Sequence, residues 1–173
     1  ASSMQERLGP PSGDQALAVM LPLPDALRPT SGLRTAGMVR GKTVLLYGGL
    51  AAGVHPRSAR IEEAMAVFIG HELFHLYVPS AVPVARDLSW MSEGWAMHMG
   101  RLAALDSGFV TEAGLEAQIR RTYRRYLDMG GYRAGSLPDA SMGSESQRDL
   151  LYLRGELAFW ATRPASRRTL GEC

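Results

Sequence analysis

The chain has 173 residues, of which 46% are hydrophobic and 21% charged, the composition of an ordinary globular protein of about one domain. Its net charge of +2, from 19 basic and 17 acidic residues, argues against nucleic acid or an anionic membrane as a partner. The single cysteine, Cys173, excludes a disulfide within the chain and a cysteine-based zinc site. No stretch is long enough to span a membrane, and no secretory signal is visible at Ala1, so compartment and oligomeric state stay open. The four arginines within residues 120–125 are interpreted as the solvated face of a helix.

Two strands are predicted near the N-terminus. Residues 17–23 form a short apolar run that ends at proline. Residues 38–47 are predicted to form a second strand, with residues 44–47 as its core and Gly48 and Gly49 at its end. Residues 24–37, between the two runs, are rich in turn-forming residues. The sequence therefore predicts a small N-terminal sheet.

Four helices are predicted after residue 57. Ser58, Asp87 and Thr111 are each placed to cap a helix, and the Ser-Glu-Ser-Gln stretch at residues 144–147 is a capping box. Prolines or glycines follow each helical pattern. The predicted helices run from residue 58 to before Pro79, from 87 to about 105, from 111 to about 130, and from about 145 to 161. Since no linker divides the chain, we expect one mainly α (α+β) domain over residues 1–173.

The stretch HELFH, at residues 71–75, is the strongest functional signal in the chain. On a helix, His71 and His75 are one turn apart and differ by about 40° in direction, so both imidazoles can reach one metal ion. Glu72, beside the first histidine, can act on a water at the metal without being a ligand. Imidazole ligands and four-coordinate geometry favour zinc, with one ion per chain. The alternative is that the two histidines are ordinary residues of a buried helix.

A catalytic zinc ion needs a third protein ligand, and the following helix offers Glu93. Glu93 lies 18 positions after His75 and would give a two-histidine, one-carboxylate set. We expect Gly94 to let this helix approach the metal-binding helix closely. The alternative is that Glu93 is a surface residue, but its stripe also carries Trp90 and Met97, which are apolar.

HELFH, followed by WMSEGWA at residues 90–96, resembles the gluzincin (thermolysin-like) zinc metallopeptidases, and within them the glycyl and alanyl aminopeptidase families. The resemblance implies a thermolysin-like catalytic domain, a helical bundle around the zinc site with its core at about residues 38–161. It implies zinc bound by His71, His75 and Glu93, with Glu72 as the base in hydrolysis of a peptide or protein substrate. Whole enzymes of these families carry further β-rich domains, so we expect a fragment of a longer protein.

Two more stretches fit this resemblance. LYLRG, at residues 151–155, resembles the Y-x-K-G element of these families, which implies that Tyr152 donates a hydrogen bond to the oxyanion. The alternative for Tyr152 is ordinary core packing. Gly48 and Gly49 resemble the G-G-L of the glycyl group, which implies an edge strand that binds the substrate backbone by strand addition.

The sequence also departs from these families. The alanyl group has a glutamate in its strand motif that holds the free amino group of the substrate, whereas residues 48–53 contain no carboxylate. His98 stands where these families often carry tyrosine, and it fits either a contact near the metal or plain packing. Two rival functions remain. One is a catalytically inactive gluzincin-like domain that binds zinc or peptides. The other is a structural helical domain in which HELFH is a coincidence and Glu93 lies far from both histidines.

Overall fold

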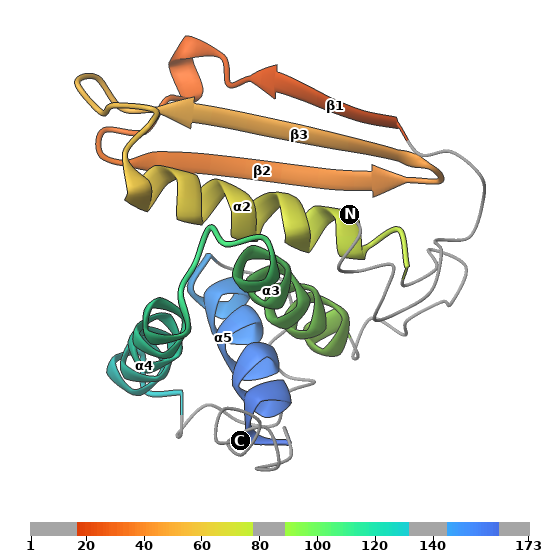
Figure 1. The fold of residues 1–173 in the computed structure, drawn as a ribbon, viewed down its shortest axis with the longest axis vertical. Helices are drawn as coiled ribbons and strands as arrows, with labels where there is room; N and C mark the ends of the chain where they lie inside the picture. The colour runs from red at the N-terminus through yellow and green to blue at the C-terminus, as the bar shows by residue number, and fades with distance from the viewer. Residues whose placement is uncertain (1–16, 78–88, 132–144, 163–173) are drawn as a thin grey trace.

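The computed structural model describes residues 17–77, 89–131 and 145–162. A three-stranded sheet lies along one side of helix α2, and helices α3 and α5 lie on the other side (Figure 1). Helix α4 packs on α5 (Figure 1). The elements are β1 (Leu17–Pro22), a 3-10 turn η1 (Asp25–Leu27), β2 (Leu33–Arg40), β3 (Thr43–Leu50), α2 (Ala59–Phe74), α3 (Ser89–Asp106), α4 (Glu112–Asp128) and α5 (Glu145–Ala161). The expected combination of several helices with a small N-terminal sheet is confirmed.

The sheet has the order β1-β3-β2, with β1 parallel and β2 antiparallel to β3. The central strand β3 supplies the buried side chains Val44 and Leu46, which face α2. In β2, Gly37 pairs with Leu46 and so lies on the same face. Within the described residues, β2 has one unpaired edge, and β2 is the strand that runs next to α2 (Figure 1).

The prediction of a single strand over residues 38–47 is wrong. These residues form the end of β2 and most of β3, joined by a two-residue turn at Gly41 and Lys42. Gly41 has φ +59°, which the first central position of a type II′ hairpin turn requires and which glycine adopts at little cost. The residues predicted as turn-rich include the first half of β2, and β3 continues through Gly48 and Gly49 to Leu50.

The four helices begin and end within a few residues of the predicted bounds. The Thr111 side chain accepts a hydrogen bond from the Gly114 backbone N–H at 3.1 Å, as an N-cap should. Ser58 occupies the N-cap position of α2, but its side chain makes no capping hydrogen bond. The predicted caps at Asp87 and at residues 144–147 involve side chains outside those that the structure describes.

Pairs of glycines bring the helices unusually close together. A Cβ atom on Gly100 of α3 would lie 2.5 Å from the Val67 carbonyl oxygen and 2.8 Å from the His71 nitrogen in α2. A Cβ on Gly94 would overlap the backbone of Gly155 in α5. The expectation that Gly94 faces the metal-binding helix is therefore wrong, because Gly94 packs on α5 while Gly100 makes the contact with α2.

An ion pair buried among the helices joins α3, α4 and α5. Arg101 donates hydrogen bonds to both carboxylate oxygens of Glu156, and also to Gln118 and Thr122 of α4. The Trp160 indole N–H lies 3.3 Å from the same carboxylate. Since Glu156 is only 2% exposed, its charge depends on these partners. Among the helices in the described ranges, none is long and apolar enough to cross a membrane.

Candidate metal centre

Three potential ligand atoms form a compact triangle between α2 and α3. His71 Nε2 lies 3.2 Å from His75 Nε2 and 3.3 Å from Glu93 Oε2, and the third side, from His75 Nε2 to Glu93 Oε2, is 3.6 Å. Tetrahedral zinc with bonds of 2.0–2.1 Å would hold its ligand atoms about 3.3–3.4 Å apart. The residues therefore fit one zinc ion, with one position of the tetrahedron left for water or substrate.

Local helix geometry and the close crossing of two helices together build this triangle. His71 and His75 are placed by the single turn of α2 that separates them, with ring centroids 4.9 Å apart. Glu93 arrives from α3, which can lie against α2 because Gly70 and Gly100 carry no side chains where the helices meet. The rival interpretation of HELFH as a coincidence predicted Glu93 far from both histidines, which this arrangement contradicts.

The electrostatics of the three side chains suit a cation. Burial alone would raise the pKa of Glu93, but its hydrogen bonds to His71 and His75 outweigh this and hold that pKa far below its usual range. Burial alone would lower the pKa of His75, yet the Glu93 carboxylate outweighs it and raises that pKa above 6.5. Glu93 is therefore ionised, and the positive charge that balances it can come from a metal ion as well as from a proton. His71 Nδ1 is buried and has no hydrogen-bond partner within the described residues.

Glu72 lies beside the triangle and is 7% exposed. Its Oε1 is 3.9 Å from His71 Nε2. One ring nitrogen of His71, one of His75 and one carboxylate oxygen of Glu72 lie within 4.8 Å of one another. Burial raises the pKa of Glu72, the two histidines lower it, and Glu93 raises it further, with a net upward shift. A carboxylate whose pKa moves toward neutrality is better suited to accept and return a proton.

Tyr152 reaches the centre from α5. Its ring centroid lies 6.0 Å from that of His71. The contact between Gly94 and Gly155 sets α5 against α3 one turn from Tyr152, and this contact brings the tyrosine beside the centre. His98, in contrast, packs on aromatic side chains of α5, with ring centroids 4.3 Å from Trp160 and 6.0 Å from Phe159.

Gly48 and Gly49 do not lie on an edge strand, contrary to what the family resemblance implied. Both are in β3, which is paired with β1 on one side and β2 on the other. The Gly48 carbonyl oxygen accepts a hydrogen bond from the Leu23 backbone at 2.9 Å, and the missing side chain of Gly49 leaves room for Leu23. Strand addition by a substrate is therefore not available at β3.

Sequence reasoning missed Gly37, the glycine of the sheet that does contact the centre. It belongs to the edge strand β2, and the Glu72 side chain occupies the space that a Cβ on Gly37 would need. The signal that could have revealed it is the two-residue turn at Gly41 and Lys42, which would have shown that residues before the turn form a strand.

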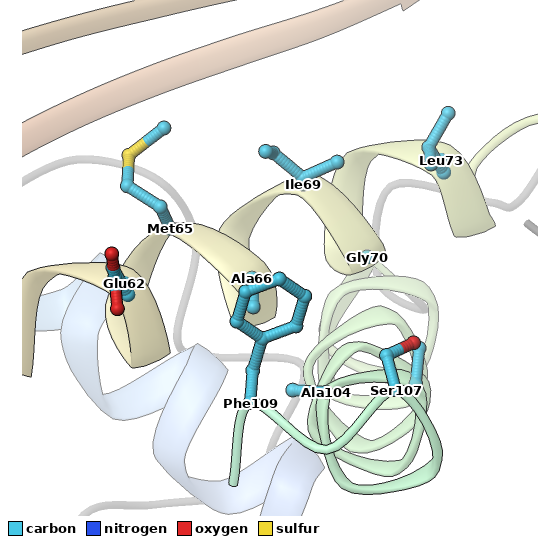
Figure 2. A pocket seen from close by; sticks show the side chains of 10 residues that line it. Glu62, Met65, Ala66, Ile69, Gly70, Leu73, Ala104, Ser107 and Phe109 are labelled. Atoms are coloured by element: carbon cyan, nitrogen blue, oxygen red, sulfur yellow. The ribbon is translucent and has the colours of Figure 1, made fainter. Parts of the chain in front are cut away.

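A separate apolar pocket of about 270 Å³ lies between α2 and α3 (Figure 2). Ala66, Ile69, Gly70 and Leu73 line it from α2, and the exposed ring of Phe109 borders it from beyond α3 (Figure 2). On a helix with 3.6 residues per turn these four positions point away from the face that carries the two histidines. The pocket is therefore not part of the metal centre.

Comparison of the sequence with models of known protein families and with curated proteins finds no match. The resemblance to gluzincin metallopeptidases therefore rests on the sequence motifs of this chain alone.

Proposed function

We propose that this chain is a zinc-dependent hydrolase of peptide bonds, with one zinc ion bound by His71, His75 and Glu93. The observation that carries the proposal is the triangle of Nε2, Nε2 and Oε2 atoms with sides of 3.2, 3.3 and 3.6 Å, with the buried Glu72 beside it. A thermolysin-like arrangement is part of the same proposal. It is supported by a helix bearing H-E-x-x-H that lies between an edge strand and a second helix bearing the glutamate.

In this mechanism the side chains of the chain have separate tasks. A zinc ion at the triangle would act as a Lewis acid and lower the pKa of a bound water to about 7. Glu72 accepts a proton from the attacking water and delivers it to the leaving amine nitrogen. Tyr152 donates a hydrogen bond to the oxygen of the scissile carbonyl as negative charge develops there.

The substrate in this proposal is a peptide or protein segment in extended conformation. The edge of β2 that remains unpaired among the described residues runs beside α2, and Gly37 in that strand is solvent-exposed above the buried Glu72. An extended peptide can add to such an edge through backbone hydrogen bonds, which places its carbonyl groups near the base. The resemblance favours aminopeptidase-like cleavage.

Metal content and peptide cleavage, measured on the same preparations, test the proposal. We expect about one zinc per chain in the wild type and its loss in His75→Ala, because two protein ligands hold zinc much less tightly than three. His98→Ala removes a histidine that lies outside the triangle, so it should keep the metal and serves as the matched control. Glu72→Gln should also keep the metal, but it should no longer cleave a mixed peptide library, with cleavage measured by mass spectrometry.

The other outcomes identify the rival functions. Zinc in the wild type without any cleavage would indicate a catalytically inactive domain that binds zinc or peptides. No zinc in the wild type after zinc is supplied would refute the metal centre and leave a structural helical domain. Full cleavage activity in Glu72→Gln would refute the assignment of the base.

A further inference from the structure

The side chain of Glu72 fills the space that a side chain on Gly37 would need. A Cβ built on Gly37 would lie 2.6 Å from Glu72 Cγ, and the carboxyl carbon and Oε1 would be closer still. Real Cβ contacts essentially never fall below 3.0 Å, so any residue other than glycine at position 37 must displace Glu72. The backbone of Gly37 itself has no positive φ that would require glycine.

We propose that Gly37 is a positioning residue, which holds the Glu72 carboxylate at the metal centre by leaving it the space beneath β2. This inference rests on the proposed function, because it concerns the base of that reaction. Among the described residues, the three atoms nearest to a Cβ at this position all belong to Glu72, and Gly37 lies within a regular strand rather than in the adjoining turn. Glycine weakens a strand interior, so its presence here fits a close approach by another group.

The contact involves the same carboxylate oxygen that lies near His71, because Glu72 Oε1 is one of the atoms that a Cβ on Gly37 would meet. Gly37 and Leu46 share the face of the sheet that covers α2, while His71 Nε2 lies 3.9 Å from Glu72 Oε1. The carboxylate is thus held between the backbone of β2 and the ligand triangle. A Cβ at position 37 would force it to retreat by roughly 1 Å, a displacement that can cost about 10²-fold in rate.

The same geometry predicts that the fold will tolerate the change. The atoms that a Cβ would meet are at the far end of the flexible Glu72 side chain and not in the backbone. The carboxylate can move by rotation of its side chain, so neither β2 nor α2 has to shift. The three atoms nearest to that Cβ all belong to Glu72, and none belongs to His71, His75 or Glu93. Zinc binding should therefore persist.

The test is a double-mutant cycle of Gly37→Ala with Glu72→Ala, assayed for zinc content and for kcat and KM on a peptide that the wild type cleaves. Gly37→Ala should keep one zinc per chain, leave KM nearly unchanged and lower kcat by about 10²-fold. All three atoms that a Cβ on Gly37 would meet, Cγ, Cδ and Oε1 of Glu72, are absent from alanine at position 72. In the Glu72→Ala background, Gly37→Ala should therefore lower the residual rate by less than about threefold, a clear departure from additivity.

Ala18→Val is the control, because it adds methyl groups to the same sheet on the exposed edge strand β1. It should leave kcat and zinc content unchanged. Wild-type kcat in Gly37→Ala, or an equal loss in both Glu72 backgrounds, overturns the positioning role while leaving the proposed function standing. Loss of zinc in Gly37→Ala also overturns it, because the residue would then support the metal site as a whole. A wild type that binds zinc but cleaves no peptide refutes the proposed function, and the inference with it.

Discussion

Replacement of Arg101 by methionine is expected to destabilise the chain strongly. Arg101 is 13% exposed in its side chain and Glu156 is 2% exposed, so the variant leaves a carboxylate buried without its counter-ion. Only the Trp160 indole N–H at 3.3 Å would remain among the hydrogen bonds described for that carboxylate. Removal of one partner from a buried ion pair costs about 3–5 kcal/mol. For a chain of this length this corresponds to a fall in Tm of roughly 10 °C.

Arg120 provides a matched control for this measurement. It pairs with Glu116 on the surface of α4, where the side chains are 67% and 65% exposed. Solvent screens an exposed pair of this kind, so Arg120→Met should change the free energy of unfolding by less than about 0.5 kcal/mol. Urea denaturation, monitored by circular dichroism, gives both values.

The double variant Arg101→Met, Glu156→Met separates loss of the pair from exposure of a lone charge. Replacement of both partners by apolar side chains of similar volume is often neutral, so the double variant should recover most of the stability lost in Arg101→Met. If Arg101→Met costs no more than Arg120→Met, the ion pair is not buried as described. If the double variant is less stable than Arg101→Met, the cost does not come from a lone buried charge.

Three further changes test the packing, the metal centre and a helix cap. Gly94→Ala should cost at least about 1–3 kcal/mol in a urea titration, because its methyl group overlaps the backbone of Gly155, and an unchanged midpoint would contradict the close crossing of α3 and α5. In the metal-free chain, the stability that protonated His75 gains from Glu93 is fully present below pH 6.5 and is lost as pH rises through the raised pKa. Zinc must displace that proton, so its affinity should rise with pH across this range, and calorimetry near pH 6 in buffers of different ionisation enthalpy should detect proton release. A zinc affinity that stays constant from about pH 5.5 to 7.5 would argue against His75 as a ligand. Thr111→Ala should destabilise the chain by about 1 kcal/mol in thermal unfolding, through loss of the N-cap of α4, and no change in Tm would show that the cap contributes nothing.

The helices could be predicted from the sequence because their signals are local. Capping residues, apolar periodicity and the prolines and glycines that follow all lie within a few positions of the helix ends. The N-cap at Thr111 was predicted from residue type alone and is confirmed by a hydrogen bond. The pair formed by His71 and His75 is equally local, since one turn of any α-helix places residues i and i+4 on one face.

The sheet was predicted only in part, because strand pairing depends on contacts that sequence patterns do not specify. The stretch of residues 38–47 is interrupted by Arg40, Gly41, Lys42 and Thr43, and the chain reverses there at Gly41, whose φ is +59°. Which strand occupies the centre of the sheet is decided by the crossover that sets β1 beside β3. The expected edge strand was therefore assigned to β3 instead of β2.

By itself the sequence determined the donor atoms of the proposed metal centre: two imidazoles on one helical turn, and a carboxylate 18 residues later. Tertiary structure decided whether they meet, since that depends on how closely the backbones of α2, α3 and α5 approach one another. Gly100 faces α2, and Gly94 faces α5, an assignment that the sequence could not make between two glycines of one helix. The contact of Gly37 with Glu72 could not be predicted from the sequence either. A glycine has no side chain, so no residue pattern indicates which group occupies the space beside it.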